Sequence, residues 1–201
     1  MVAMRWALVG FAAALTVVSA PAAAQMTLSL GLGYAGSSGV TNSATDASAE
    51  IRSTAVWNVA LGKTLDGTRE AQLIFQQQST TLDPGGGIAP FDLTIRYLHL
   101  GGTVFFENTV GKGGYVVGGL GATQFSPSTS GLGSEFRPSL SLGAGYSWPL
   151  AQSVDLRAEV RGYFTLVNSS GDFLCSGGCV VRLTSDLFSQ FEATLSVLGR
   201  F

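Results

Sequence analysis

Hydrophobic and polar residues alternate along much of the chain, a period-two pattern that is typical of β-strands with two different faces. Residues 154–168 show it most clearly, with an apolar face opposite a polar and charged one. Four other segments repeat the alternation: residues 27–34, 52–65, 136–148 and 187–201. Three more alternate less regularly: residues 70–81, 91–107 and 114–125. The pattern therefore predicts eight strands.

The polar faces of residues 154–168 and 187–201 carry charges. Six residues make up this set: Asp155, Arg157, Glu159, Arg161, Glu192 and Arg200. If the eight strands close into a barrel, its interior has just enough room for side chains to fill, and charges buried there must be paired. We therefore expect the six residues to form a charge-balanced network that plugs a barrel lumen, rather than a catalytic acid–base pair or the wall of a wide pore.

The connections between the strands alternate in length. Three are short: residues 66–67, 108–113 and 149–153. Four are long, polar and rich in Gly, Ser and Pro: residues 35–49, 82–90, 126–135 and 169–186. Short turns at one end, long loops at the other and an even number of strands are typical of transmembrane barrels. Closure also satisfies every backbone group in a bilayer. We expect an all-β fold, an eight-stranded antiparallel up-and-down barrel with both termini on the periplasmic side, and a two-residue turn with positive φ at Asp66-Gly67.

Composition supports a membrane location. Charged residues make up 12% of the 201, about half the share of roughly 25% in soluble domains, and the mean hydropathy is +0.33. The isoelectric point near 5.3 leaves no basic surface for nucleic acid.

A soluble β protein with its apolar face inward would show the same alternation of apolar and polar residues. Six aromatic residues near strand ends favour the interfacial girdles of a membrane barrel instead: Tyr34, Phe125, Tyr146, Trp148, Phe164 and Phe201.

The first 24 residues have the features of a secretory signal peptide. Arg5 precedes an apolar run at residues 6–18 that is too short to span a membrane as a helix. Ala22 and Ala24 occupy the two small positions before a predicted cleavage site at Gln25. The expected organisation is a signal peptide over residues 1–24 followed by one barrel domain over residues 25–201.

The last strand of the chain carries a pattern that is characteristic of one class of membrane protein. Apolar residues recur at alternate positions up to a terminal aromatic, among them Phe191, Leu195, Val197 and Phe201, although Gly199 stands where a bulky residue is preferred. This pattern resembles the assembly signal of Gram-negative outer-membrane β-barrels. The chain from residue 25 resembles the small eight-stranded class of the OmpA-transmembrane and OmpX type. The resemblance implies insertion into the cell outer membrane by the barrel assembly machinery, in contact with outer-membrane lipid and lipopolysaccharide.

Two motifs carry weaker chemical signals. Gly31–Gly36 matches the G-x-G-x-x-G fingerprint of dinucleotide sites, but the helix which that motif requires does not follow, so we interpret the glycines as lumen-facing and expect no cofactor. Cys175 and Cys179 lie in the longest loop. An even pair in an exported protein predicts a disulfide, which would rigidify that loop, whereas two cysteines without a nearby histidine are too few for zinc.

His99 is the only histidine. A hydrolase would need it beside a serine nucleophile, and the His-x-Ser pair of barrel lipid A deacylases is missing because Leu100 and Gly101 follow. We therefore expect a histidine that is either packed or in the aromatic girdle, and no enzymatic activity. The expected role is structural or adhesive: the protein would stabilise the envelope, or present its loops to a host surface, lipopolysaccharide or another protein.

Two other functions stay open at this point. The first is a narrow channel for small hydrophobic molecules, as in OmpW-like barrels. Such a channel would need an apolar lumen near the outer rim, whereas the strand faces predicted to line the lumen are polar. The second is a lipid A-modifying enzyme that uses His99.

Overall fold

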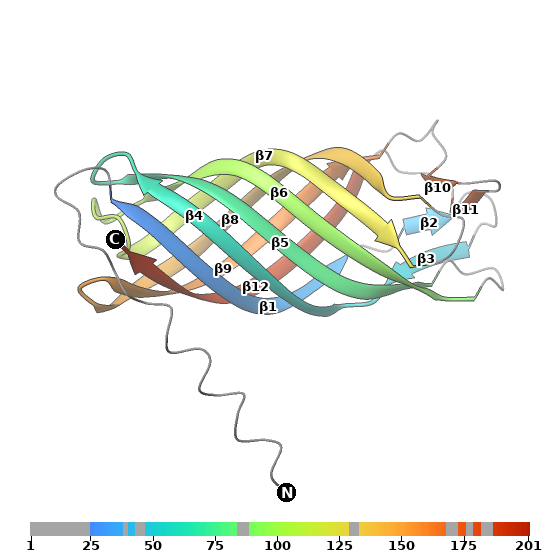
Figure 1. Cartoon of the computed structure of the whole chain (residues 1–201), viewed down its shortest axis with the longest axis horizontal. Coiled ribbons are helices and arrows are strands. Elements are labelled where there is room, and N and C mark those ends of the chain that lie inside the picture. The colour runs from blue at the N-terminus through green and yellow to red at the C-terminus, as the bar shows by residue number, and fades with distance from the viewer. Residues whose placement is uncertain are drawn as a thin grey trace, which may run out of the picture.

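The computed structural model describes residues 25–37, 40–42, 47–83, 89–128, 133–167, 173–175, 179–181 and 187–201. Eight long antiparallel strands form its body: β1 (Met26–Ser37), β4 (Thr54–Thr64), β5 (Arg69–Asp83), β6 (Phe91–Phe105), β7 (Gly113–Pro127), β8 (Glu135–Ala151), β9 (Val154–Leu166) and β12 (Leu187–Arg200). Each pairs with the next along the chain, and β1 pairs with β12, so that the sheet closes on itself (Figure 1). The predicted eight-stranded up-and-down barrel is confirmed.

The two ends of the barrel differ. Both chain ends of the barrel and the three short turns lie at one end, which we call the turn end, where Met26 and Phe201 exchange two backbone hydrogen bonds of 3.0 Å (Figure 1). The other end, the loop end, carries four further short strands that the sequence pattern did not predict. They pair as two hairpins: β2 (Val40–Asn42) with β3 (Ala47–Ile51), and β10 (Phe173–Cys175) with β11 (Cys179–Val181).

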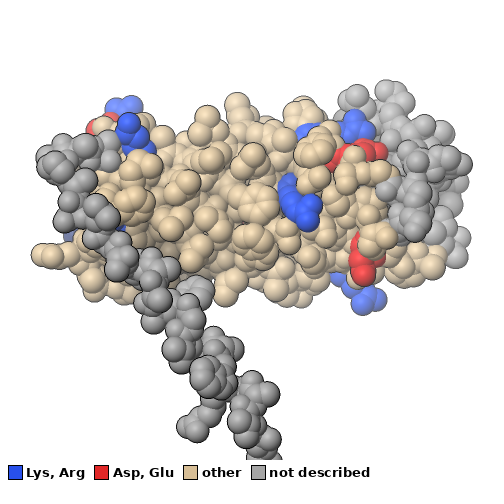
Figure 2. All heavy atoms as spheres, viewed as in Figure 1, with Lys and Arg blue, Asp and Glu red and all other residues tan. Residues whose placement is uncertain are grey.

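The exterior of the barrel is apolar. Leu32, Leu100 and Leu120 are 72%, 66% and 71% exposed, and Figure 2 shows a broad zone without charged groups between those at the two ends. Soluble monomers rarely expose apolar patches larger than a few hundred Å². An exterior of this kind is stable when lipid covers it, because burial of apolar area from water is worth about 25 cal/mol per Å². Nowhere in the described part of the chain is there a helix long and apolar enough to cross a membrane.

The aromatic girdle is confirmed with one exception. Four of the predicted aromatic residues are 43–59% exposed on the exterior: Tyr34, Tyr146, Trp148 and Phe201. Phe164 of β9 also points outward, and its ring contacts that of exposed Phe191. The prediction for Phe125 is wrong, since its ring is buried inside the barrel, with its centroid 5.5 Å from that of Phe188. The irregular alternation of β7 concealed which way this residue points.

The turn between β4 and β5 also differs from the prediction. Gly67 is not among the described residues with positive φ, which are Asn108, Gly111 and Gly113. The Asp66 carboxylate holds this turn instead, by accepting hydrogen bonds from the backbone N–H groups of Thr68 (2.8 Å) and Arg69 (2.9 Å). The Thr68 backbone N–H, followed by the Thr68 hydroxyl, lowers the pKa of Asp66 below its usual value.

Candidate functional site

The half of the lumen nearest the turn end holds buried ion pairs. Arg200 pairs with Asp155, Arg157 donates to Glu70 over 2.9 Å, and Arg161 donates to Glu159 over 2.7 Å. The Arg157 and Glu70 side chains are 5% and 0% exposed. All six charges predicted to face the lumen do so: Asp155, Arg157, Glu159, Arg161, Glu192 and Arg200.

Glu70 is the partner that sequence reasoning missed. It lies on β5, whose lumen face also contributes Gln72, Gln76 and Gln78. An apolar residue, Ile74, interrupts this polar row, which is why the alternation looked irregular. The recurrence of Glu and Gln at every second position on either side of Ile74 was the signal that would have found it.

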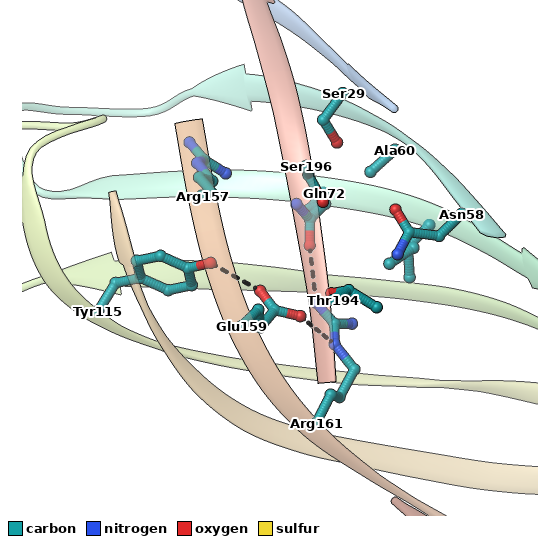
Figure 3. Close-up of a pocket in the computed structure, with 11 residues that line it drawn as sticks. Ser29, Asn58, Ala60, Gln72, Tyr115, Arg157, Glu159, Arg161, Thr194 and Ser196 are labelled. Atoms are coloured by element: carbon teal, nitrogen blue, oxygen red, sulfur yellow. Dashed lines mark hydrogen bonds and ion pairs between the residues drawn. The ribbon is translucent and has the colours of Figure 1, made fainter. Parts of the chain in front are cut away.

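A small cavity in the lumen is lined by Gln72, Tyr115, Arg157, Glu159 and Arg161, among others (Figure 3). The Tyr115 hydroxyl donates to Glu159 over 3.0 Å, and Arg161 bridges Glu159 to Gln72, to which it donates over 3.3 Å. The cavity volume is about 20 Å³, which is room for about one water molecule. A cavity of this size cannot admit an organic solute.

His99 lies in the middle of the lumen, between two serines of β8. Its Nδ1 is 2.9 Å from the Ser141 hydroxyl and its Nε2 is 2.8 Å from the Ser139 hydroxyl. The ring also contacts Tyr97 and Tyr163 edge-on, and it is fully buried. Of the two positions expected for this histidine, packed or in the girdle, the structure shows the packed one. The sequence-local search for a serine partner nevertheless missed both serines, which reach His99 from 40 and 42 residues away.

The loop end of the lumen is apolar. Eight buried residues form one cluster there: Leu82, Leu93, Ile95, Tyr97, Phe125, Tyr163, Val167 and Phe188. The Tyr97 and Tyr163 rings stack with centroids 4.1 Å apart, and the Tyr97 hydroxyl donates to Gln190 over 3.0 Å. The expectation that the lumen is polar throughout is therefore wrong. Five of the eight residues fall on the irregular strands β5, β6 and β7, and Val167 and Phe188 lie at strand ends.

The glycine motif forms no nucleotide site. Gly31 lies within β1, which continues as a strand to Ser37. A Cβ atom at Gly31 would collide with the Ser196 and Asn58 side chains, so glycine is required there by close packing in the lumen. The described residues hold no group of three His, Cys, Asp or Glu side chains placed to bind a metal ion.

The predicted assembly signal lies on the outer face of β12. Phe191, Leu195, Val197 and Phe201 are all more than half exposed, so lipid can reach them. Their role in assembly stays a prediction. The signal peptide, with Ala22 and Ala24, falls outside the described residues, and Gln25 is the first residue described.

The cysteines face each other in the backbone register. Cys175 of β10 pairs directly with Cys179 of β11. Residues paired in this way have Cα atoms about 4.5–5.5 Å apart, within the 4.4–6.8 Å or so that disulfides span. The backbone therefore permits the predicted disulfide, which stays a prediction.

Known structures share this architecture. Neisserial surface protein A is similar with a TM-score of 0.61 and 15% identity, over 88% of this chain and 97% of that one. The outer membrane protein OprG from Pseudomonas aeruginosa is similar with a TM-score of 0.56 and 11% identity, over 89% and 96%. No protein-family model and no curated protein matches the sequence. The chain therefore has the fold of the small eight-stranded outer-membrane β-barrels.

Proposed function

We propose that this protein is an integral protein of the Gram-negative outer membrane whose lumen is closed to solutes and whose role is structural or adhesive, carried by its outer loops. The observation that carries the proposal is the filled lumen. Ion pairs occupy the turn end, His99 and its serines occupy the middle, and the apolar cluster occupies the loop end. A barrel that conducts nothing can act on its surroundings only through its surfaces.

The loop end is the surface with the most material for such contacts. It carries the four long connections and both short hairpins. In outer-membrane barrels the longer loops face outward, so they would meet a host surface, lipopolysaccharide or another protein. The barrel assembly machinery would place the protein there, reading the exposed apolar residues of β12.

The surroundings of His99 support a protein without enzymatic activity. Both ring nitrogens are engaged by serine hydroxyls, and the ring is fully buried. A lipid substrate on the exterior or at the rim could not reach either serine. A general base needs access to the proton that it removes.

Fractionation and conductance test the proposal together. The protein should enter the outer-membrane fraction and migrate differently on SDS gels before and after boiling. In planar bilayers, the purified barrel should give no steady conductance. A soluble periplasmic product would refute the membrane location, and a steady open channel would refute the closed lumen. Replacement of residues 169–186 by a Gly-Ser linker of equal length should abolish adhesion of expressing cells to a host-cell monolayer while the gel shift persists.

A second candidate is a narrow passage for small hydrophobic molecules. The observation in its favour is the apolar cluster at the loop end, where an apolar solute would enter. The cluster is closed by its own packing, so such a passage would require Phe125 and Phe188 to move apart. Uptake of naphthalene into vesicles that contain the protein separates the two functions. If the wild type takes up naphthalene and the Phe188→Glu variant does not, the result favours the passage. If vesicles with the wild-type protein take up no more naphthalene than empty vesicles, the passage is ruled out.

A further inference from the structure

A polar group interrupts the apolar exterior on three neighbouring strands. Arg96 of β6 pairs in register with Gln77 of β5 on one side and with Gln124 of β7 on the other. Its Nε donates to the Gln77 side-chain oxygen over 2.8 Å, and its Nη1 donates to the Gln124 side-chain oxygen over 3.2 Å. Two amides from separate strands therefore hold one guanidinium on the outside of the barrel.

This group offers hydrogen-bond donors, and its partners among the described residues are two neutral amides. A guanidinium has five N–H donors, and the two glutamines occupy two of them. Six described Arg and Lys side chains pair with a carboxylate: Arg69, Lys112, Arg137, Arg157, Arg161 and Arg200. Arg96 has no carboxylate partner within the described part of the chain. Because both glutamines accept with their oxygens, their NH₂ groups are left as further donors beside the guanidinium.

The register places Arg96 at the edge of the apolar band. One step toward the turn end, the exterior row is Phe75, Leu98 and Ala122, and one step toward the loop end it is Ser79, Thr94 and Ser126. Two exposed aromatic residues flank the Arg96 row itself, Trp57 on β4 and Phe136 on β8.

The height of the band agrees with this placement. The ten or so residues from Arg96 to exposed Phe106 rise about 33 Å along the strand at about 3.3 Å each, and a tilt of about 40° projects this to about 25 Å. That height matches the apolar band of an outer-membrane barrel, so Arg96 lies at the boundary with the outer-leaflet headgroups.

We propose that Arg96, held by Gln77 and Gln124, is a binding site for a phosphate group on the headgroup of an outer-leaflet lipid, as in lipid A. The inference rests on the proposed outer-membrane location. Guanidinium and phosphate form bidentate charge-assisted hydrogen bonds, and the free N–H groups of Arg96 can supply both. The lipid's acyl chains would then lie along Phe75 and Leu98, and its polar groups beside the hydroxyls of the next row. Charge and apolar surface thus favour a lipid over a free anion.

The test uses the full-length barrel in nanodiscs and measures its affinity for bisphosphorylated lipid A. The variant is Arg96→Gln, and the matched control is Arg69→Gln, which removes the same charge from an exposed site at the turn end. We expect about a tenfold weaker affinity for Arg96→Gln, which is the loss of one charge-assisted contact, and an unchanged affinity for Arg69→Gln. Dephosphorylated lipid A should bind the wild type and Arg96→Gln alike.

The outcomes separate this inference from the proposed function. Equal affinity of Arg96→Gln and wild type for bisphosphorylated lipid A would overturn the site. Displacement of lipid A by millimolar inorganic phosphate would also overturn it, since the site would then recognise free phosphate rather than a lipid. Heat-dependent gel mobility and membrane fractionation are checked on the same preparations. A wild-type protein absent from the outer membrane would refute the proposed function, whereas a correctly located barrel with an unchanged variant refutes only the lipid site.

Discussion

The buried pair of Glu70 and Arg157 gives a sharp test of the plugged lumen. Glu70 accepts from Arg157 over 2.9 Å with one oxygen and from the Thr27 hydroxyl over 2.7 Å with the other. Removal of one partner of a buried ion pair leaves an uncompensated charge and typically costs 3–5 kcal/mol. In Glu70→Gln the amide oxygen still accepts from Thr27, so we expect a loss at the lower end, about 3 kcal/mol in the free energy of unfolding.

The double variant Glu70→Gln/Arg157→Met tests whether the loss of stability comes from an unpaired buried charge. Arg157→Met alone should also cost about 3 kcal/mol, because it leaves the Glu70 carboxylate unpaired in the lumen. With both charges removed, no buried charge is left alone, so the cost should fall to about 1–2 kcal/mol. Met would still pack against Phe105 and Tyr115, whose ring centroids lie 5.3 and 5.6 Å from the guanidinium carbon in the wild type.

Urea unfolding in phospholipid vesicles measures these changes. Trp57 and Trp148 lie on the exterior, 40% and 43% exposed, so their fluorescence changes when the barrel leaves the lipid. Glu107→Gln is the matched control, because its pair with Lys112 is long, at 3.7 Å, and exposed. Its loss should cost less than about 1 kcal/mol. Single variants that each cost less than about 1 kcal/mol, with costs that add in the double variant, would refute the plug.

Four further predictions follow from other parts of the barrel. His99→Leu should lower the free energy of unfolding by about 2–4 kcal/mol in the same urea assay, because two buried serine hydroxyls lose their partner; an unchanged midpoint would contradict this. Gly101→Ala should abolish the heat-dependent gel shift, since its Cβ would collide with the backbone of β7, whereas Gly199→Ala, with open space around it, should keep the shift. The Asp66 carboxyl should titrate below its usual pKa of 3.8 by ¹³C NMR; because its folded pKa is lowered, the contribution to stability is present above the unfolded pKa and is lost as the pH falls through the folded value. Alkylation of the unreduced protein followed by mass spectrometry should find no reactive thiol at Cys175 or Cys179, and two after reduction; two thiols before reduction would refute the disulfide.

The alternation of residues was enough to determine the strands and the faces of the regular ones. On β9, spacing put Asp155, Arg157 and Arg161 on one face, the expected membrane location pointed that face inward, and the structure buries all three. The reason is that side chains in a strand point to opposite faces at every step. A membrane barrel amplifies this signal, because one face meets lipid and the other a polar interior.

Spacing along one strand cannot say which side chains meet across the barrel. Glu70 reaches Arg157 across 87 positions of sequence, and His99 meets serines of a strand that is not its neighbour. These contacts depend on strand register, tilt and closure, which together set the height of every residue in the lumen. The same holds for Phe125, which was predicted to lie in the exterior girdle because its strand alternates irregularly, whereas its ring is buried against Phe188. The sequence by itself determined a closed barrel with two different faces and a charged lumen, and only the tertiary structure decided which side chains pair inside it and that aromatic and aliphatic packing fills its loop end.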